Sequence, residues 1–181
     1  VGGGFVVTWR SDNAQDGSGS GIYAQRYDAF GVAVDEEFRV NEGTSSNQRE
    51  PAIIGLADGG FVISWTDDSG RDGSGAGVFA QQYDANGNRI DGEFQVNTEF
   101  SGGQGLPGIA ALNNGGFVIG WQSQTSLTAG DGSGNGIFHQ VFGDPIDFVT
   151  QGAPPIEGVS SEVTFLENSV NAGPQLLDVD Q

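Results

Sequence analysis

The sequence predicts an all-β protein in which one four-stranded antiparallel unit is repeated with a period of about 56 residues. Three observations lead to this prediction. The segment GGFVxxW occurs three times at the same spacing, at 3–9, 59–65 and 115–121. Short apolar pieces rich in β-branched and aromatic residues lie between Gly, Asp and Asn, which is the pattern of strands and turns. No segment shows the helical spacing of apolar residues over two turns.

The complete unit, 51–106, contains all four predicted strands. In chain order these are AIIGL at 52–56, FVISW at 61–65, VFAQQY at 78–83 and EFQVN at 93–97. The tetrapeptide ADGG separates the first two, and DANG follows the third. Gly and Asn accept a positive φ, so both tetrapeptides are predicted to be hairpin turns. Each unit is therefore predicted to fold as a meander.

The other two units, 1–50 and 107–149, are incomplete. The first lacks its opening strand, and the third lacks its fourth strand and has an insertion around TSLTAG. A four-stranded meander at a fixed period is typical of a β-propeller blade, although a β-sandwich or a stack of small sheets would show the same pattern. Propellers have about 4–8 blades. Three units therefore predict a piece of a larger array, or an oligomer.

The second strand of each unit predicts burial on both faces. Phe61, Ile63 and Trp65 share one face because strand side chains alternate with period two. The side chains on the opposite face are small and partly apolar, and the same holds for the strands that contain Trp9 and Trp121. The three tryptophans are therefore interpreted as core residues rather than as sugar-stacking platforms.

Two polar positions in the third strand need an interpretation: one is repeated in all three units, and the other occurs in the third unit alone. Gln25, Gln81 and Gln140 repeat there, and because buried polar groups need partners we expect them to bond to the backbone of a neighbouring unit. The single histidine, His139, stands where the other units have alanine. We interpret it as a drifted repeat position and not as a catalytic base.

The last segment, 150–181, does not match the repeat. It contains the Pro/Gly-rich stretch GAPPIEG, followed by VTFLE and PQLLDVD. Such stretches are typical of linkers between modules. The segment is predicted to be a linker and the start of a second β module.

Composition excludes several classes of function. The formal charge of −18 opposes binding to nucleic acid phosphates and favours cations. No apolar run approaches the ~20 residues of a membrane-spanning helix. The chain has no cysteine and one histidine, so a nucleophile paired with a base is nearly unavailable, and nothing picks out a pair among the 24 acidic residues. We therefore do not expect an enzyme.

The repeated unit DGSGxGIYAQRYDxxGxxxxxEFxVN and the tail VTFLENSVNAGPQLLDVD resemble a known class of sequence. They are similar to repeats, and to a following cadherin-like segment, in large secreted calcium-binding RTX-type bacterial surface proteins and adhesins. The resemblance implies export without disulfides, calcium-dependent folding, a role at the cell surface and no enzyme activity. The nonapeptide GGxGxDxUx of RTX β-rolls is not repeated here, so its calcium function does not carry over.

The hexapeptide DGSGxG occurs at 16–21, 72–77 and 131–136 and has two interpretations. It is a calcium loop, since Ca²⁺ binds carboxylate and carbonyl oxygens, or it is a long hairpin loop in which Asp closes a turn. The third copy has lost the neighbouring acids, which favours the turn. The candidate calcium ligands are Asp12, Asp16, Asp67, Asp68, Asp72 and Asp131.

These observations favour a non-catalytic structural or adhesive segment of a large exported bacterial surface protein, rigidified by calcium. The alternative is a carbohydrate-binding, lectin-like propeller that recognises cell-surface glycans. The absence of aromatic residues from the loops 10–21, 66–77 and 122–136 weighs against it. An enzyme propeller is less favoured still. The expected partners are other repeats of the same parent chain or copies of this chain.

Overall fold

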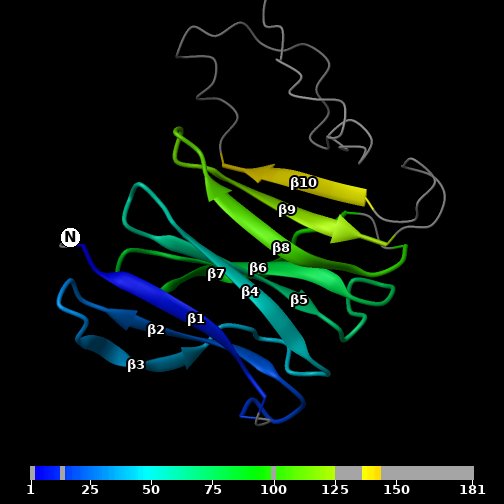
Figure 1. Cartoon of the computed structure of the whole chain (residues 1–181), viewed down its shortest axis with the longest axis horizontal. Coiled ribbons are helices and arrows are strands. Elements are labelled where there is room, and N and C mark those ends of the chain that lie inside the picture. Colours follow the sequence, from blue (N-terminus) through cyan, green and yellow to red (C-terminus); the bar gives the residue numbers. More distant parts are fainter. Residues whose placement is uncertain (1–2, 13–14, 99–100, 125–135, 144–181) are drawn as a thin grey trace, which may run out of the picture.

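The computed structural model describes residues 3–12, 15–98, 101–124 and 136–143, and within them the chain is all β, with no helix. Ten strands form three antiparallel sheets (Figure 1). The first sheet holds β1 (Phe5–Ser11), β2 (Gly21–Tyr27) and β3 (Ala33–Arg39); the second holds β4 (Gln48–Gly55), β5 (Phe61–Asp67), β6 (Gly77–Tyr83) and β7 (Arg89–Gln95); the third holds β8 (Gln104–Ala111), β9 (Phe117–Ser123) and β10 (Gly136–Phe142).

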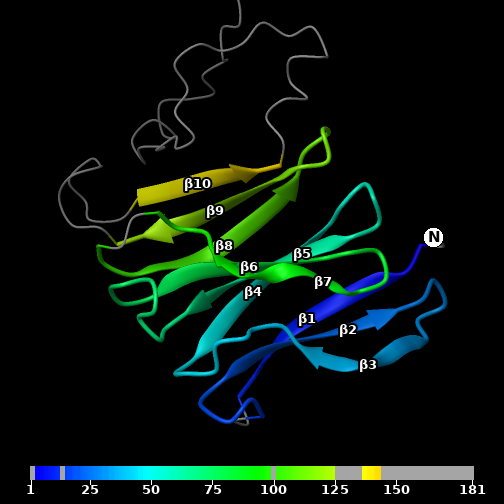
Figure 2. The same cartoon turned by 180° about the vertical axis from the view of Figure 1, so that it is seen from behind.

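Each sheet is a meander, because every strand pairs with the strand that precedes or follows it in the chain. The second sheet lies between the other two, as the front and back views agree (Figures 1 and 2). The sheets are open and stack on one another. Within the described residues the arrangement is therefore a stack of small sheets. Such a stack is one of the alternatives to the propeller that the sequence pattern allows.

The first strand of a unit begins earlier than the sequence predicts. β4 starts at Gln48 and β8 at Gln104, three residues before the predicted unit boundaries at Pro51 and Pro107. In both strands the pairing register shifts across the proline, between Arg49 and Ala52 and again at the equivalent place in the next unit. Proline has no N–H for the ladder, so a bulge is where a paired strand accommodates it.

The core lies in two interfaces between the sheets. In the first, Phe61, Ile63 and Trp65 of β5 pack in one cluster with Ile22 and Ala24 of β2. The second interface repeats this contact with equivalent residues, which are Phe117, Ile119 and Trp121 of β9 together with Val62, Val78 and Ala80 of the second sheet. Both faces of β5 are thus buried, as the alternation predicted.

The repeated glutamine in the third strand has a different role from the predicted one in the first two units. Gln25 Nε2 donates to the carbonyl oxygens of Arg26 (2.9 Å) and Val34 (3.1 Å), which belong to its own sheet. Gln81 does the same in the next unit. For these two residues the prediction of a bond to a neighbouring unit was wrong, and for Gln140 it stays a prediction. The side chain lies at a bulge between the third and fourth strands and satisfies the carbonyl groups there.

Several predictions fall outside the described residues. They are the linker and second module at 150–181, the insertion around TSLTAG, and Asp131. Among the residues that the structure does describe, no helix is long and apolar enough to cross a membrane.

Candidate functional site: the repeated Asp-Gly loops

The loop between β5 and β6 is built as a tight turn around Asp72. Its Oδ1 atom accepts a hydrogen bond from the backbone N–H of Ser74 at 3.1 Å. The N–H of Gly73, whose φ is +113°, donates to the carbonyl of Gly70 at 3.0 Å. In the first unit Asp16 accepts in the same way from Ser18. An aspartate that bonds the backbone two residues on is a recognised turn former, which agrees with the turn interpretation.

The second oxygen of the same carboxylate reaches a distant part of the chain. Asp72 Oδ2 accepts from Asn97 Nδ2 at 3.1 Å, and that amide also donates to Gln104 Oε1 at 3.2 Å. Asn97 Oδ1 accepts the backbone N–H of Val78 at 2.8 Å. All three side chains are buried. We call Asp72, Asn97 and Gln104 the second clasp.

An equivalent first clasp lies one unit earlier and consists of Asp16, Asn41 and Gln48. Asn41 Nδ2 donates to Asp16 Oδ2 at 3.3 Å and to Gln48 Oε1 at 3.1 Å, and its Oδ1 accepts the N–H of Ile22 at 2.7 Å. In each clasp the asparagine follows the last strand of one unit and the glutamine opens the next unit. The clasps therefore join consecutive units.

The last glycine of the hexapeptide is required by this contact. A Cβ atom on Gly77 would lie 2.8 Å from the carboxylate carbon of Asp72, and one on Gly21 would lie 2.8 Å from Asp16 Oδ2. Both distances are too short for any side chain. The aspartate at the start of DGSGxG and the glycine at its end are thus one structural element.

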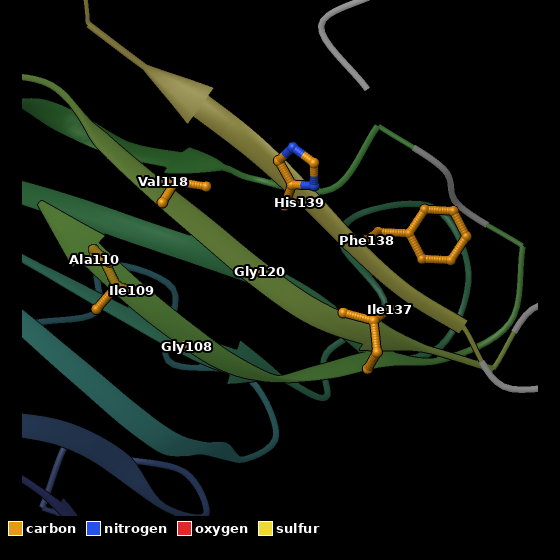
Figure 3. Close-up of a pocket in the computed structure, with 8 residues that line it drawn as sticks. All are labelled: Gly108, Ile109, Ala110, Val118, Gly120, Ile137, Phe138 and His139. Atoms are coloured by element: carbon orange, nitrogen blue, oxygen red, sulfur yellow. The ribbon is translucent and has the colours of Figure 1, made fainter. Parts of the chain in front are cut away.

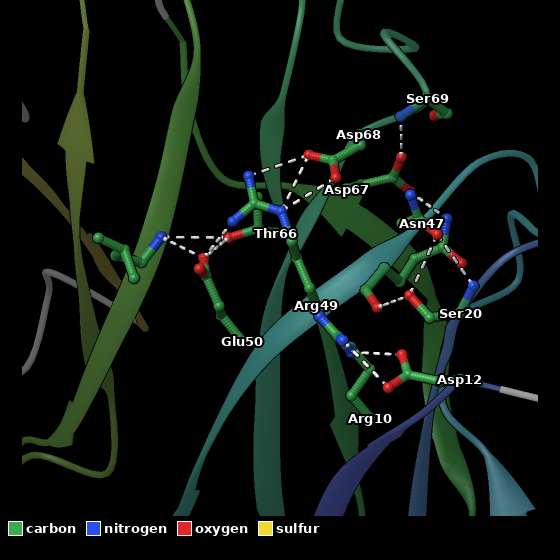
Figure 4. Close-up of polar contacts among 12 residues, drawn as sticks. Arg10, Asp12, Ser20, Asn47, Arg49, Glu50, Thr66, Asp67, Asp68 and Ser69 are labelled. Carbon is green, nitrogen blue, oxygen red and sulfur yellow. Dashed lines mark hydrogen bonds and ion pairs between the residues drawn. The ribbon is translucent and has the colours of Figure 1, made fainter.

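Two other predicted ligands, Asp67 and Asp68, form ion pairs with arginine instead. Figure 4 shows the pair of Asp68 with Arg49. Asp68 accepts from Arg49 in a bidentate arrangement, with both contacts at 3.0 Å. The side chain of Asp67 is fully buried, and its Oδ2 lies 2.9 Å from Arg71 Nη2. Planar guanidinium groups suit such paired contacts. Both carboxylates are therefore neutralised within the protein.

Glu93 of β7 takes part in a charged contact between the first and second units. It accepts from Arg71 and from the backbone N–H groups of Glu42 (2.7 Å) and Gly43 (3.1 Å), which lie in the segment between β3 and β4. Burial raises the pKa of this carboxyl, but the hydrogen bonds from Arg71 and the two backbone groups outweigh burial and leave the pKa below its ordinary value. Glu93 is thus held in its charged form.

The five predicted calcium ligands that lie within the described residues are not brought together. Asp12 pairs with Arg10 at 2.7 Å, and each clasp contributes one carboxylate whose Oδ2 already faces an amide donor. Within the described ranges no three acidic or histidine side chains are placed to share an ion. Calcium takes six to eight oxygen ligands. The described side chains alone do not form a calcium site, and calcium binding stays a prediction of the sequence.

A polar contact between the second and third sheets completes the connections. Glu50 Oε2 accepts from Thr66 Oγ1 at 2.9 Å and from the backbone N–H of Leu106 at 3.2 Å (Figure 4). Leu106 has a φ of +54° and lies in the bulge of β8. Glu50 therefore satisfies a donor that the bulge takes out of the ladder, and this is again a contact between units.

No family model matches the chain, and no curated protein is significantly similar to it. Some solved structures do resemble it. Among them is an endo-arabinase from Bacteroides thetaiotaomicron, with a TM-score of 0.42 and 17% sequence identity. The likeness covers 68% of this chain and 48% of that chain, so the chain spans about half the length of the enzyme. A likeness this distant carries no argument about activity.

The asparagine and glutamine of each clasp were not predicted from the sequence. Asn and Gln recur seven positions apart in both units, as Asn41 with Gln48 and Asn97 with Gln104. A polar pair repeated at a fixed spacing beside a repeated aspartate was the available signal. Its partners lie 25 residues away in the chain, and no local pattern shows that distance.

Proposed function

We propose that the chain is a non-catalytic structural or adhesive segment of a large exported bacterial surface protein, in which stacked β units form a scaffold. One observation supports this most strongly. The side chains that define the repeat are used to hold units together, either in the apolar interfaces or in the two clasps. Repeat proteins in which each unit contacts its neighbours typically serve as spacers and extended surfaces.

The two alternatives have weaker support. Trp65 and Trp121 are buried between sheets and offer no sugar platform. Trp9, the third tryptophan of the repeat, is half-buried, so its interpretation as a core residue holds only in part. The repeated acidic side chains are engaged with arginine or amide groups. A lectin or an enzyme would need ligand-facing groups of another kind.

The surface role is tested by labelling intact cells of the organism that encodes the chain with antibodies raised against residues 1–181. We expect labelling without permeabilisation, and loss of the label after mild protease treatment of whole cells. A cytoplasmic protein serves as the control for cell integrity. Label that appears only after permeabilisation would reject the proposal. A glycan array with a dose-dependent hit would replace it with the lectin.

The resemblance to calcium-binding surface proteins suggests that calcium makes the chain more rigid. Thermal unfolding tests this part of the proposal. If calcium binds only the folded chain, its stabilisation follows the logarithm of the ligand excess, about 2.7 kcal/mol at a hundredfold excess over Kd. We expect the Tm to rise with calcium relative to chelator, and Asp72→Ala to abolish the rise. The matched control is Asp58→Ala, in a turn away from the clasp. Equal Tm values in calcium and chelator would leave the hexapeptide a structural turn alone.

A further inference from the structure

The two interfaces between sheets are the same contact made twice. A presenting face, formed by Phe, Ile and Trp of β5 or β9, covers an accepting face on the preceding sheet. The register establishes the equivalence of the accepting faces, because Val78 pairs with Thr66 and Ile137 pairs with Gln122, at corresponding positions of β6 and β10. Each sheet therefore has one face of each kind.

Within the described part of the chain, nothing covers the presenting face of the first sheet. It consists of Phe5, Val7 and Trp9 on β1. Phe5 is 50% exposed and Val7 43% exposed, whereas their equivalents Phe61 and Ile63 are 5% and 0% exposed. The same side chains that fill the two interfaces thus lie open to solvent here.

No described residue covers the accepting face of the third sheet either. Its residues are Val118 and Gly120 on β9, with Ile137 and His139 on β10 (Figure 3). Ile137 is 49% exposed, whereas its equivalents Ile22 and Val78 are fully buried beneath the next sheet. These residues line a shallow hollow of about 440 Å³ that is mostly apolar. Exposed apolar patches of this kind mark interaction sites.

We propose that the chain associates with a second copy of itself head to tail, so that the presenting face of one copy covers the accepting face of the other. The argument is one of continuity, because the structure already joins these two kinds of face twice within one chain. The contact is heterologous, so it leaves a free face at each end and extends into open chains or closes into rings. It requires only the stacking of units and does not depend on a surface role.

Charge sets the conditions in which the contact forms. Each copy has a net charge of −18, and two copies therefore repel at low ionic strength. Screening shortens the range of this repulsion to about 8 Å at 0.15 M salt. Association should accordingly strengthen as salt rises, which is the opposite of an interface held by ion pairs.

The orientation is tested by cysteine pairing, because the native chain has no cysteine. Full-length Val7→Cys and Ile137→Cys are mixed in equal amounts and oxidised mildly. Their equivalents, Ile63 and Ile22, lie in one core cluster. We expect the mixed disulfide to dominate over either homodimer. Random collision would give the two homodimers together as much product as the mixed dimer, and that result would overturn the proposal.

The strength of association is tested by sedimentation velocity of the full chain from low to high micromolar concentration. We expect growth in size with concentration, and Ile137→Asp to weaken the association about tenfold or more, since it places a charge in an apolar contact. Phe30→Asp is the matched control, because Phe30 is 92% exposed in the turn between β2 and β3, and the side chain of its equivalent Asn86 stays exposed although the backbone there contacts Arg26 of the first sheet. Its association should equal that of the wild type.

Two outcomes would reject the inference. One is a chain that remains monomeric at every concentration and salt. The other is Ile137→Cys that resists a thiol reagent in such a monomer, because the chain would then cover its own accepting face. Both Ile137 and Val7 are half-exposed, so their variants should fold, and an unchanged Tm confirms that they do.

Discussion

Replacing Trp65 with alanine is expected to lower the free energy of unfolding by about 3–5 kcal/mol, the usual cost of deleting a buried aromatic side chain. Trp65 is fully buried in the interface between the first and second sheets, where Phe79 pairs with it across the strands and also belongs to the cluster. Its loss would leave a cavity between two sheets. Chemical denaturation of the full chain, with fluorescence and circular dichroism as independent probes, measures the change.

The matched control is Trp9→Ala, at the same position of the preceding unit. Trp9 is only half-buried, because none of the described sheets covers its face. We expect its loss to cost about half as much or less, in proportion to the apolar area removed from water. Equal costs for the two variants would contradict the assignment of Trp65 to an interface between sheets.

Replacing Asn97 with aspartate is expected to destabilise the chain by about 3 kcal/mol. The new carboxylate can still accept the N–H of Val78, but it replaces the amide donor that faces Asp72 with a second negative charge in a buried site. The exposed Asn113→Asp, in the turn between β8 and β9, is the control and should change stability by no more than about 0.5 kcal/mol. Thermal melting compares the two.

The double variant Asp72→Asn/Asn97→Asp separates the clasp from a general effect of charge. It returns one amide and one carboxylate to the site with their positions exchanged. We expect it to recover about half of the loss, because the contact to Gln104 is not restored. Interaction energies of this kind are what double-mutant cycles measure. Strict additivity of the two single changes would show that Asp72 and Asn97 do not interact.

Much of the fold follows from local rules that the sequence displays. The alternation around Trp65 predicts two buried faces, and the structure confirms them. The turn ADGG is confirmed as well, because Asp58 Oδ1 accepts the N–H of Gly60 at 2.8 Å and Leu56 bonds the same residue across the turn. Both features depend on neighbours in sequence, and strand and turn chemistry is of that kind.

The parts that the sequence did not predict depend on contacts over longer distances. The local pattern of apolar residues predicted that the first strand begins after Pro51. In the structure the strand begins at Gln48, because the chain pairs with β5 from that residue onward. The acidic residues suggested a shared ion, but Asp68 lies 19 positions from its partner Arg49, and only the pairing of β4 with β5 brings the two together. Spacing alone does not distinguish an aspartate that binds metal from one that accepts from an arginine or an amide.

Every sheet has one presenting face and one accepting face, and this repetition has a consequence for how such a protein changes in length. Each unit supplies one face of each kind, the Asp and Asn of the clasp to the next unit, and the Gln of the clasp to the preceding unit. A duplication or deletion of one whole unit in the gene therefore creates no new type of junction. The remaining units keep the neighbours that they require, since each interacts only with the units beside it. Related genes should therefore differ by whole units, with insertions confined to loops, and no compensating substitutions should be needed in the core.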